Sequence, residues 1–406
     1  MTSPLRDQRH FSASIGAHSP VSSGPEKGPA SGSALDAPRL RAVHRAVAEL
    51  RRGTPVLLSG PEPLILLAAE TAGARGLGEF AALAAQPAAL LLAPSRAAGL
   101  LRRADFAEPP ASGAGAAAVA LRLTPALATP AMLASMADPT LEQLLTEPPA
   151  LLPAPVQSAA ALALAKLARL LPAVLAAPPG PMAEEVAARL SLLRVPAADV
   201  LAYPQEAAAG LRRVAEAAVP LEGARDARIV AFRTADSGIE HLAIVIGAPQ
   251  RTAAPLVRLH SECFTGDLLG SLRCDCGTQL RGAIRRMAED GAGVLLYLAQ
   301  EGRGIGLVNK LRAYALQDRG LDTVDANRAL GWGADERNFM VAAVMLRALD
   351  VHRIRLLTNN PEKVQALAAC GIEVAAREAH AFAANGVNDQ YLATKAARFG
   401  HLLDGA

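Results

Sequence analysis

The chain has 406 residues, which is enough for two or three domains that each bury a core of their own. The formal net charge is only +3, with 19% charged residues, which excludes a protein whose overall positive charge attracts nucleic acid. An anionic partner must therefore be recognised at a local site. Three of the four cysteines lie within fourteen residues, a usage that is typical of a reducing compartment and favours metal binding or catalysis over disulfides. We therefore expect a cytoplasmic protein with no nucleic-acid partner.

Residues 1–37 are rich in Ser, Gly and Pro and contain no apolar run like that of a signal peptide, which predicts a disordered leader. The apolar tract 87–94 is too short to span a membrane, and the tract 159–178 is interrupted by Lys166 and Arg169. We expect no membrane partner.

Residues 38–205 are rich in Ala, Leu and Pro, and the spacing of their apolar residues predicts alternating helices and strands, typical of an α/β domain. Pro-rich joints at 148–155 and 178–181 predict short helices and loops in the remainder. The expected elements, in chain order, are a helix at 39–53, a strand at 55–60, a helix at 64–74, a strand at 88–94 and a helix at 95–104.

Residues 206–406 are chemically more varied and read as a separate domain that opens with strands. The expected elements are strands at 227–234 and 241–247 joined by a turn at 235–238, a helix at 277–291, a strand at 293–300, helices at 306–320 and 337–350, a strand at 353–359 and a helix at 361–371. The whole chain is therefore expected to be mixed α and β, of the α+β or α/β class.

The cysteine cluster lies in the segment 258-RLHSECFTGDLLGSLRCDCGTQL-280. Its spacing differs from that of paired C-x-x-C knuckles. If the segment around Cys274 and Cys276 is extended, both thiols point to one face and can approach one metal together with Cys263, while Asp275 points away. Three thiolates leave zinc one ligand short of a tetrahedral set, as in catalytic sites where water completes it. Spacing alone leaves open that His260 closes a structural site.

Other candidate residues are weaker when each is taken alone. The segment 300-QEGRGIGLVNK-310 surrounds Glu301 and Arg303 with glycines, which suits a phosphate or a purine edge but also a simple tight bend. The spacing of Asp335 and Arg337, before a helix, is that of a cap or a surface ion pair. Similarly, Thr358 and Lys363 flank a strand end and a helix start, where an anion is favoured. Tyr314, one turn after Lys310, can be a core residue or a hydroxyl donor.

Taken together, four segments resemble GTP cyclohydrolase II of riboflavin biosynthesis in the order of that family, over roughly residues 210–406: the cysteine segment, 300-QEGRGIGLVNKLRAYALQDRGLDTVDAN-327, 333-GADERNF-339 and 356-LLTNNPEKV-364. The resemblance implies a hydrolase that acts on cyclic amidine C–N bonds. It would convert GTP to 2,5-diamino-6-(5-phosphoribosylamino)pyrimidin-4-one, formate and diphosphate, the first step of riboflavin biosynthesis. It also implies one Zn²⁺ per subunit, Mg²⁺ bound with GTP, and a homodimer.

Carried over position by position, the resemblance assigns the zinc to Cys263, Cys274 and Cys276. The matching GTP-contacting positions are Arg258, Leu259, His260, Ser261, Glu262, Gln279, Glu301, Gly302, Arg303, Thr323, Thr358 and Lys363. The predicted catalytic residues are Asp335 as proton acceptor, Arg337 as nucleophile toward the α-phosphate and Tyr314 in ring opening and formate release. A guanidinium is normally protonated, so charge stabilisation is an equally physical role for Arg337.

The segments 43-VHRAVAELRRGTPVLL-58 and 66-LLAAETAG-73 more faintly resemble 3,4-dihydroxy-2-butanone 4-phosphate synthase. That family carries a dense acidic loop for magnesium, whereas this chain reads 59-SGPEPLI-65, with Glu62 as its one carboxylate, and has no histidine between His44 and His241. We therefore expect residues 38–205 to be a degenerate, inactive synthase-like domain kept for packing, assembly or regulation.

Three alternative functions stay open from the sequence. The protein could be bifunctional and also make 3,4-dihydroxy-2-butanone 4-phosphate, or it could be a paralogue that processes GTP differently. A third possibility, from a different class, is a non-catalytic nucleotide-binding protein.

Overall fold

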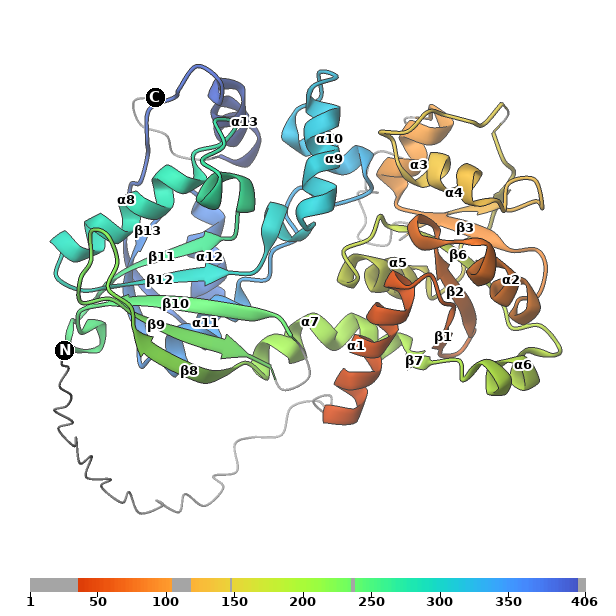
Figure 1. Cartoon of the computed structure of the whole chain (residues 1–406), viewed down its shortest axis with the longest axis horizontal. Coiled ribbons are helices and arrows are strands. Elements are labelled where there is room, and N and C mark those ends of the chain that lie inside the picture. Colours follow the sequence, from red (N-terminus) through yellow and green to blue (C-terminus); the bar gives the residue numbers. More distant parts are fainter. Residues whose placement is uncertain (1–35, 104–117, 147, 235–237, 401–406) are drawn as a thin grey trace, which may run out of the picture. The chain divides into compact units, whose positions relative to one another are not determined.

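The structure is a computed structural model that describes residues 36–103, 118–146, 148–234 and 238–400. The predicted leader lies outside these residues except for Asp36 and Ala37, and so does most of the predicted turn at 235–238. The described residues contain helices and two mixed sheets, which confirms the predicted mixed α and β class (Figure 1).

The first sheet has seven strands in the order β5-β4-β3-β6-β2-β1-β7. Neighbouring strands are antiparallel except for β1 and β7, which run parallel. The strands are β1 (Val56–Ser59), β2 (Leu64–Ala68), β3 (Ala89–Leu92), β4 (Val119–Arg122), β5 (Leu151–Leu152), β6 (Ala173–Ala177) and β7 (Arg194–Pro196).

The helices of this first half of the chain (residues 37–209) begin with the predicted amphipathic helix. Asp36 caps it by accepting a hydrogen bond from the Arg39 N–H at 3.1 Å, and its buried side includes Val43, Val47 and Leu50. The helices are α1 (Ala37–Arg51), α2 (Ala74–Leu83), α3 (Pro94–Leu101), α4 (Pro130–Ala137), α5 (Ser158–Leu167), α6 (Ala183–Leu190) and α7 (Ala197–Ala209), with a 3₁₀ turn η1 (Ala69–Thr71).

The predicted helix at 64–74 is wrong, because the structure places β2 and η1 there. All five residues of β2 are buried: Ile65 and Leu67 face one apolar core, and Leu64 and Leu66 face another. A strand covered on both faces has no alternation of apolar and polar residues, so periodicity cannot distinguish it from a buried helix. The same reason explains why β6 was not predicted.

The second sheet has seven strands in the order β14-β13-β11-β12-β10-β9-β8. Its members β14, β13, β11 and β12 run parallel, whereas β10, β9 and β8 continue the sheet in antiparallel order. The strands are β8 (Arg212–Ala218), β9 (Arg228–Arg233), β10 (Glu240–Ile246), β11 (Leu256–Ser261), β12 (Gly293–Leu298), β13 (Arg353–Leu357) and β14 (Glu373–Glu378).

The helices of the second half (residues 212–399) confirm every helix that the sequence predicted there, within a few residues at the ends. They are α8 (Cys276–Glu289), α9 (Leu307–Gln317), α10 (Thr323–Ala329), α11 (Met340–Ala348), α12 (Pro361–Ala369) and α13 (Asp389–Phe399). Shorter turns are η3 (Pro249–Arg251), the π-helical η4 (Phe264–Leu268) and η5 (Glu301–Gly304).

The described residues belong to one compact unit, and one apolar core is shared by its two halves. This core joins the first sheet, through residues such as Leu67 and Leu92, to α9 and α10 of the second half, through Leu316, Leu330 and Trp332. The first sheet therefore depends on distant sequence to cover one of its faces.

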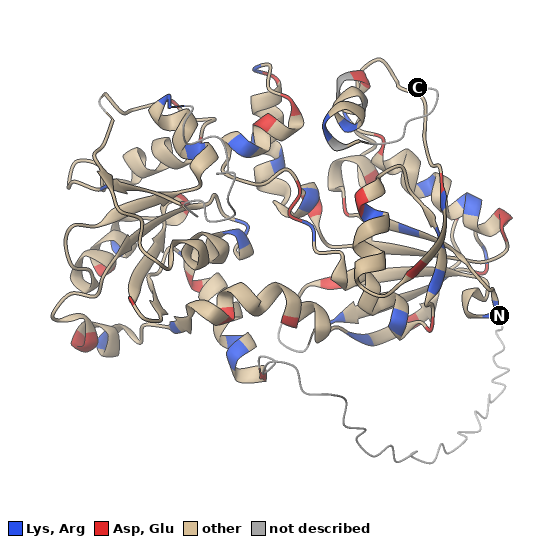
Figure 2. Ribbon diagram, turned by 180° about the vertical axis from the view of Figure 1, so that it is seen from behind, with Lys and Arg blue, Asp and Glu red and all other residues tan. Residues whose placement is uncertain are grey.

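Charge is distributed rather than concentrated. Lys and Arg are interspersed with Asp and Glu along both halves of the described chain (Figure 2). In the part of the chain that the structure describes, no helix combines the length and apolar character needed to cross a membrane.

Candidate functional site

The candidate site lies where the parallel strands of the second sheet end. Because β11, β12 and β13 run parallel, their carboxyl ends meet at one edge, the usual place for ligands in such sheets. A pocket at this edge is lined by Arg258, His260, Ser261, Glu262, Cys263, Cys274, Cys276, Gln279, Glu301, Gly302, Arg303, Ile305, Lys310, Ala313, Tyr314, Gln317, Thr323, Asn327, Arg337, Thr358, Asn359, Asn360, Lys363, His380, Tyr391 and Lys395. The fold thus brings together segments that are a hundred residues apart in the sequence.

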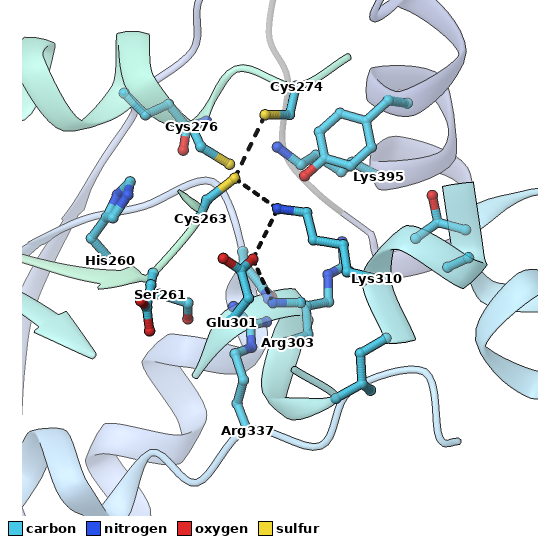
Figure 3. Close-up of a pocket in the computed structure, with 18 of the residues that line it drawn as sticks. His260, Ser261, Cys263, Cys274, Cys276, Glu301, Arg303, Lys310, Arg337 and Lys395 are labelled. Carbon is cyan, nitrogen blue, oxygen red and sulfur yellow. Dashed lines mark hydrogen bonds and ion pairs between the residues drawn. The ribbon is translucent and has the colours of Figure 1, made fainter. Parts of the chain in front are cut away.

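The three clustered cysteines converge at one point of this pocket (Figure 3). Their sulfur atoms lie within 4.8 Å of one another, and Cys263 Sγ is 3.8 Å from Cys274 Sγ. Two thiolates on one tetrahedral zinc ion, each bound at about 2.3 Å, are held about 3.8 Å apart, so the sulfur spacing fits zinc. No other group of three or more potential ligands of this kind occurs among the described residues.

The local structure around the cysteines differs from the extended segment that the sequence predicted. Cys274 lies in a turn and Cys276 is the first residue of α8, so the expectation of two thiols on one face of a strand is wrong. Asp275, between them, is the N-cap residue of α8, and its buried carboxylate pairs with Lys395 Nζ at 2.6 Å. A helix start, which folds the chain back tightly, brings the two thiols together instead.

Gly266 in η4 is packed against all three cysteines. A Cβ atom at this position would lie 2.7 Å from Cys274 Sγ, 3.0 Å from Cys263 Sγ and 3.0 Å from Cys276 Cβ, which is closer than atoms normally approach. The Gly266 N–H donates a hydrogen bond to Cys263 Sγ at 3.3 Å. The close approach of the three sulfurs therefore requires glycine here.

The three thiols do not ionise equally. Hydrogen bonds from the Cys274 and Cys276 thiols lower the pKa of Cys263, and the Lys310 ammonium, 3.1 Å from its sulfur, adds to the effect. Hydrogen bonds with Cys263 and Cys274 raise the pKa of Cys276 well above its ordinary value, because a second thiolate beside Cys263 is disfavoured. A cation at this point would balance the charge of several thiolates together.

His260 lies next to the sulfur group without being part of it. Its Nε2 is 3.0 Å from Asp267 Oδ1, and its ring stacks on Tyr297, whose hydroxyl donates to Asp267 Oδ2 at 3.0 Å. Burial lowers the pKa of His260, so the ring is neutral near pH 7 and donates to the carboxylate. The geometry therefore disfavours the alternative in which His260 closes a structural site, and leaves three protein ligands.

Glu301 connects three segments of the pocket wall. Its carboxylate accepts hydrogen bonds from the Phe264 N–H at 2.7 Å and the Gly302 N–H at 3.0 Å, and pairs with Lys310 Nζ at 2.8 Å. Gly302 and Arg303 both have a positive φ, 62° and 63°, which turns the chain sharply at the strand end. Glu301 thus organises the cysteine loop, this turn and α9.

Arg337 is held by Asp335. The Arg337 Nε donates to the two carboxylate oxygens at 2.8 and 3.0 Å, and the Arg337 N–H donates to Asp335 Oδ1 at 3.1 Å. Burial by itself would raise the pKa of Asp335, but the hydrogen bonds and charge of Arg337 offset it, and the pKa is lowered. Of these two residues, Arg337 lines the pocket and Asp335 orients its guanidinium.

A second group of cations lies at the ends of β11 and β13. Lys363 Nζ donates to the Leu259 carbonyl at 2.8 Å, and Arg258 hydrogen-bonds to Gln279. Burial and the charges of Arg337 and Arg258 lower the pKa of Lys363 well below its ordinary value. Cations that disfavour one another in this way provide a binding site for a polyanion, which would relieve their repulsion.

The remaining predicted residues fall into two groups. Tyr314 lines the pocket, with its ring centroid 4.5 Å from Arg273 Cζ, and burial raises the pKa of its hydroxyl, which therefore stays protonated. The pocket is also lined by Thr323 at the start of α10 and Thr358 after β13. By contrast, the side chain of Leu259 lies in the apolar core and offers the pocket only its backbone.

Sequence reasoning missed several residues of the pocket. Lys310 lies one helical turn before Tyr314, and this spacing could have identified it as a partner. His380, Tyr391 and Lys395 come from β14 onward, beyond the quoted motifs, and no local pattern marks them. The fourth cysteine of the chain, Cys370, is the C-cap residue of α12 and lies half-buried beside the core.

Comparison with known proteins shows which family the second half of the chain resembles. The family model described as GTP cyclohydrolase II matches residues 212–379. A GTP cyclohydrolase-2 of Azospirillum brasilense is 62% identical over 221 residues, which cover 54% of this chain and only 57% of that protein. A GTP cyclohydrolase-2 of Pectobacterium atrosepticum is 54% identical over 194 residues, which cover 48% of this chain and 98% of that protein.

Solved structures give a weaker comparison. A two-domain 3,4-dihydroxy-2-butanone 4-phosphate synthase from A. baumannii aligns with 84% of this chain and 99% of its own, at 19% sequence identity and a TM-score of 0.32. Such a score does not by itself establish a shared fold, whereas the sequence identity in the second half is decisive. The protein therefore belongs to the GTP cyclohydrolase II family, through the half of the chain that carries the three cysteines.

Proposed function

We propose that this protein hydrolyses GTP to 2,5-diamino-6-(5-phosphoribosylamino)pyrimidin-4-one, formate and diphosphate, the first step of riboflavin biosynthesis. The observation that carries the proposal is a three-thiol group that fits zinc, in the same pocket as the buried Arg258, the half-buried Lys363 and the paired Arg337. The relatives named GTP cyclohydrolase-2 support the same reaction.

In this proposal Cys263, Cys274 and Cys276 hold one zinc ion. When bound, zinc supplies a Lewis acid that lowers the pKa of water, as attack on the imidazole carbon of guanine requires. Lys310 donates to Cys263 Sγ and to Glu301, and so holds the thiolate in place. The chain's own contribution is to fix these groups beside the bound nucleotide.

We further propose that the triphosphate binds to the cations of the pocket, with Mg²⁺ bound to its oxygens. Arg337 is already paired with the carboxylate of Asp335, which orients its guanidinium. A protonated guanidinium is a poor nucleophile, so we assign it the stabilisation of phosphoryl charge. The protonated hydroxyl of Tyr314 is a donor for the opening imidazole ring.

Product analysis tests the function. Purified, zinc-loaded protein incubated with GTP and Mg²⁺ is expected to release formate and diphosphate, with the pyrimidine product identified by its mass. The variant Cys274→Ser should lose zinc and turnover together, and Arg337→Ala should lower turnover about 100-fold or more, as removal of a charge-stabilising donor does elsewhere. Release of diphosphate without formate would contradict the proposed reaction, and full activity of Arg337→Ala would contradict the site.

We propose that the first half has no synthase activity. Glu62 is an exposed residue between β1 and β2, and among the described residues no cluster of acidic ligands accompanies it. A single carboxylate is a poor magnesium site. Incubation with ribulose 5-phosphate is expected to give no formate, and turnover there would instead make the enzyme bifunctional.

Two further properties are proposals, the first implied by the family resemblance and the second by the use of cysteine. The protein is a homodimer, which sedimentation velocity would test, and it resides in the cytoplasm. Four unpaired cysteines support a reducing compartment.

A further inference from the structure

We propose that Lys166 and Arg169, at the end of α5 in the first half, are positioning residues for the cysteine-centred site in the second half. They act through two loops of the pocket wall: loop A (residues 299–306), which carries Glu301, and loop B (residues 332–337), which carries the paired Asp335 and Arg337. This inference deepens the proposed function and rests on it, because it gives the first half a part in the same reaction.

Lys166 fixes loop B. Its Nζ forms an ion pair with Glu336 Oε1 and lies 5.5 Å from the centroid of the Trp332 ring. The same Glu336 oxygen accepts a hydrogen bond from the Gly333 N–H at 2.7 Å. Both charged side chains are partly shielded, 30% and 24% exposed. Loop B therefore folds around a carboxylate whose partner comes from the first half, next to two predicted catalytic residues.

Arg169 fixes loop A. Its Nη2 donates to the Ala299 carbonyl at 2.9 Å, before the turn at Glu301. Its own carbonyl accepts a hydrogen bond from Asn309 Nδ2 at 3.0 Å, in the first turn of α9. A Cβ atom at Gly306 would lie 3.1 Å from Arg169 Cδ, so the arginine stem packs directly on the end of loop A. One residue thus holds both ends of the loop.

The two loops also pack on each other. The Glu336 N–H donates to the Arg303 carbonyl at 3.1 Å, and a Cβ atom at Gly304 would lie 2.8 Å from the Glu336 carbonyl oxygen. Loop A is therefore enclosed between Arg169 and loop B. Because Lys166 and Arg169 are three residues apart, a single segment of the first half sets the separation of the two loops.

The helix after loop A is anchored to the first half as well. Arg312 Nη2 pairs with Glu70 at 3.0 Å and its Nε with Asp138 at 2.7 Å. The same helix, α9, presents Lys310 and Tyr314 to the pocket. These contacts reinforce the one made by Arg169.

The first test is steady-state kinetics of Lys166→Met and Arg169→Met. We expect each to lower kcat for GTP about 10- to 100-fold, the effect of misplacing catalytic groups by about 1 Å, with a much smaller change in KM and unchanged zinc content. Lys166→Arg keeps the ion pair and is expected to recover most of kcat. The control is Arg194→Met, which breaks an exposed ion pair with Glu184 in the same half and should leave kcat unchanged.

A second measurement does not depend on GTP turnover. Hydrogen–deuterium exchange is expected to become faster in loops A and B of Lys166→Met and Arg169→Met, and to stay unchanged there in Arg194→Met. If the unmodified protein fails to hydrolyse GTP, the proposed function is wrong while the exchange data still test the positioning. Unchanged exchange in both loops, or a kcat that Lys166→Arg lowers as much as Lys166→Met, would overturn the inference.

A third variant distinguishes loss of the ion pair from misfolding of Lys166→Met. Glu336→Gln weakens the same ion pair from the other side with little change in size. We expect it to lower kcat by a similar factor, and the double variant with Lys166→Met to be no slower than either single variant, because both remove one interaction. Multiplicative losses would show that the two residues act separately and would contradict the proposed contact.

Discussion

At the scale of single residues, the site depends on a small residue, Gly266, as much as on its reactive cysteines. Cys263, Cys274 and Cys276 can approach one another only because Gly266 leaves room between them. The cysteines could be assigned from the sequence, since their spacing and the surrounding motif point to one metal. The need for Gly266 could not, because it arises from three atoms that meet only in the folded chain.

The variant Gly266→Ala is therefore expected to reduce zinc binding. Its Cβ would overlap Cys274 Sγ and Cys263 Sγ, so at least one thiolate must move out of reach of the ion. Metal content after dialysis against a zinc buffer should fall well below one ion per chain. A matched control is Gly78→Ala in α2, where a Cβ meets nothing within 4 Å and the helix should gain about 0.5–1 kcal/mol. Full zinc occupancy in Gly266→Ala would show that the sulfur group tolerates a wider arrangement.

At the scale of elements, strand ends bring the site together. The sequence predicted α8, α9, α11 and α12 because their amphipathic patterns and capping residues are local, as at Asn360, whose side chain accepts a hydrogen bond from the Glu362 N–H. It did not predict α10 and α13, which also line the pocket. It did not predict β11, whose residues drew attention as ligands rather than as a buried strand. On the other side of β12, β10 contributes one buried histidine that links it to loop A.

That histidine, His241, predicts a pH dependence of stability. Burial lowers its pKa to about 4, with Arg169 adding to the effect, and its Nδ1 accepts a hydrogen bond from the Ala299 N–H at 3.0 Å. The unfolded chain, with a pKa near 6.5, binds a proton that the folded chain does not, so stability is lost as pH falls from about 6.5 to 4. His241→Asn should remove up to about 3 kcal/mol of that loss.

Urea unfolding at pH 7 and pH 4.5 checks this prediction. His380, whose pKa burial also lowers to about 4, contributes to the same window, so part of the pH dependence should persist in His241→Asn. The control His352→Asn changes a side chain that is 61% exposed and should leave the pH dependence as it is. An identical loss of stability in His241→Asn and in the unmodified protein would contradict the assignment.

At the scale of the whole molecule, one core joins the two halves. Trp332, the only tryptophan of the chain, is 2% exposed and packs in the core that includes Leu67 and Leu92 of the first sheet. Trp332 comes directly before the segment 333–339, which resembles a motif of the family. Loop B, which contains both Trp332 and Arg337, thus contacts the first sheet through Trp332 and the pocket through Arg337.

This shared core predicts that the two halves unfold together. In a urea titration, the fluorescence of Trp332 and the far-ultraviolet circular dichroism of both sheets should change in one coincident transition. Leu330→Ala, which removes a 1% exposed side chain from the same core, should lower the midpoint for both signals, at a cost of about 2–5 kcal/mol. Separate midpoints for the two signals would indicate halves that fold independently.

The sequence by itself determined the family of this protein: the cysteine cluster, the glycine-rich turn and the segment with Asp335 and Arg337 follow one another in the order of that family. It also determined four helices of the second half, α8, α9, α11 and α12, whose periodicity is local. The tertiary structure alone decided which residues meet. Strands that are buried on both faces have no alternation of apolar and polar residues, so the sequence does not identify them. Contacts such as that of Lys166 with Glu336 join positions 170 residues apart, so the local sequence around either residue does not predict the contact.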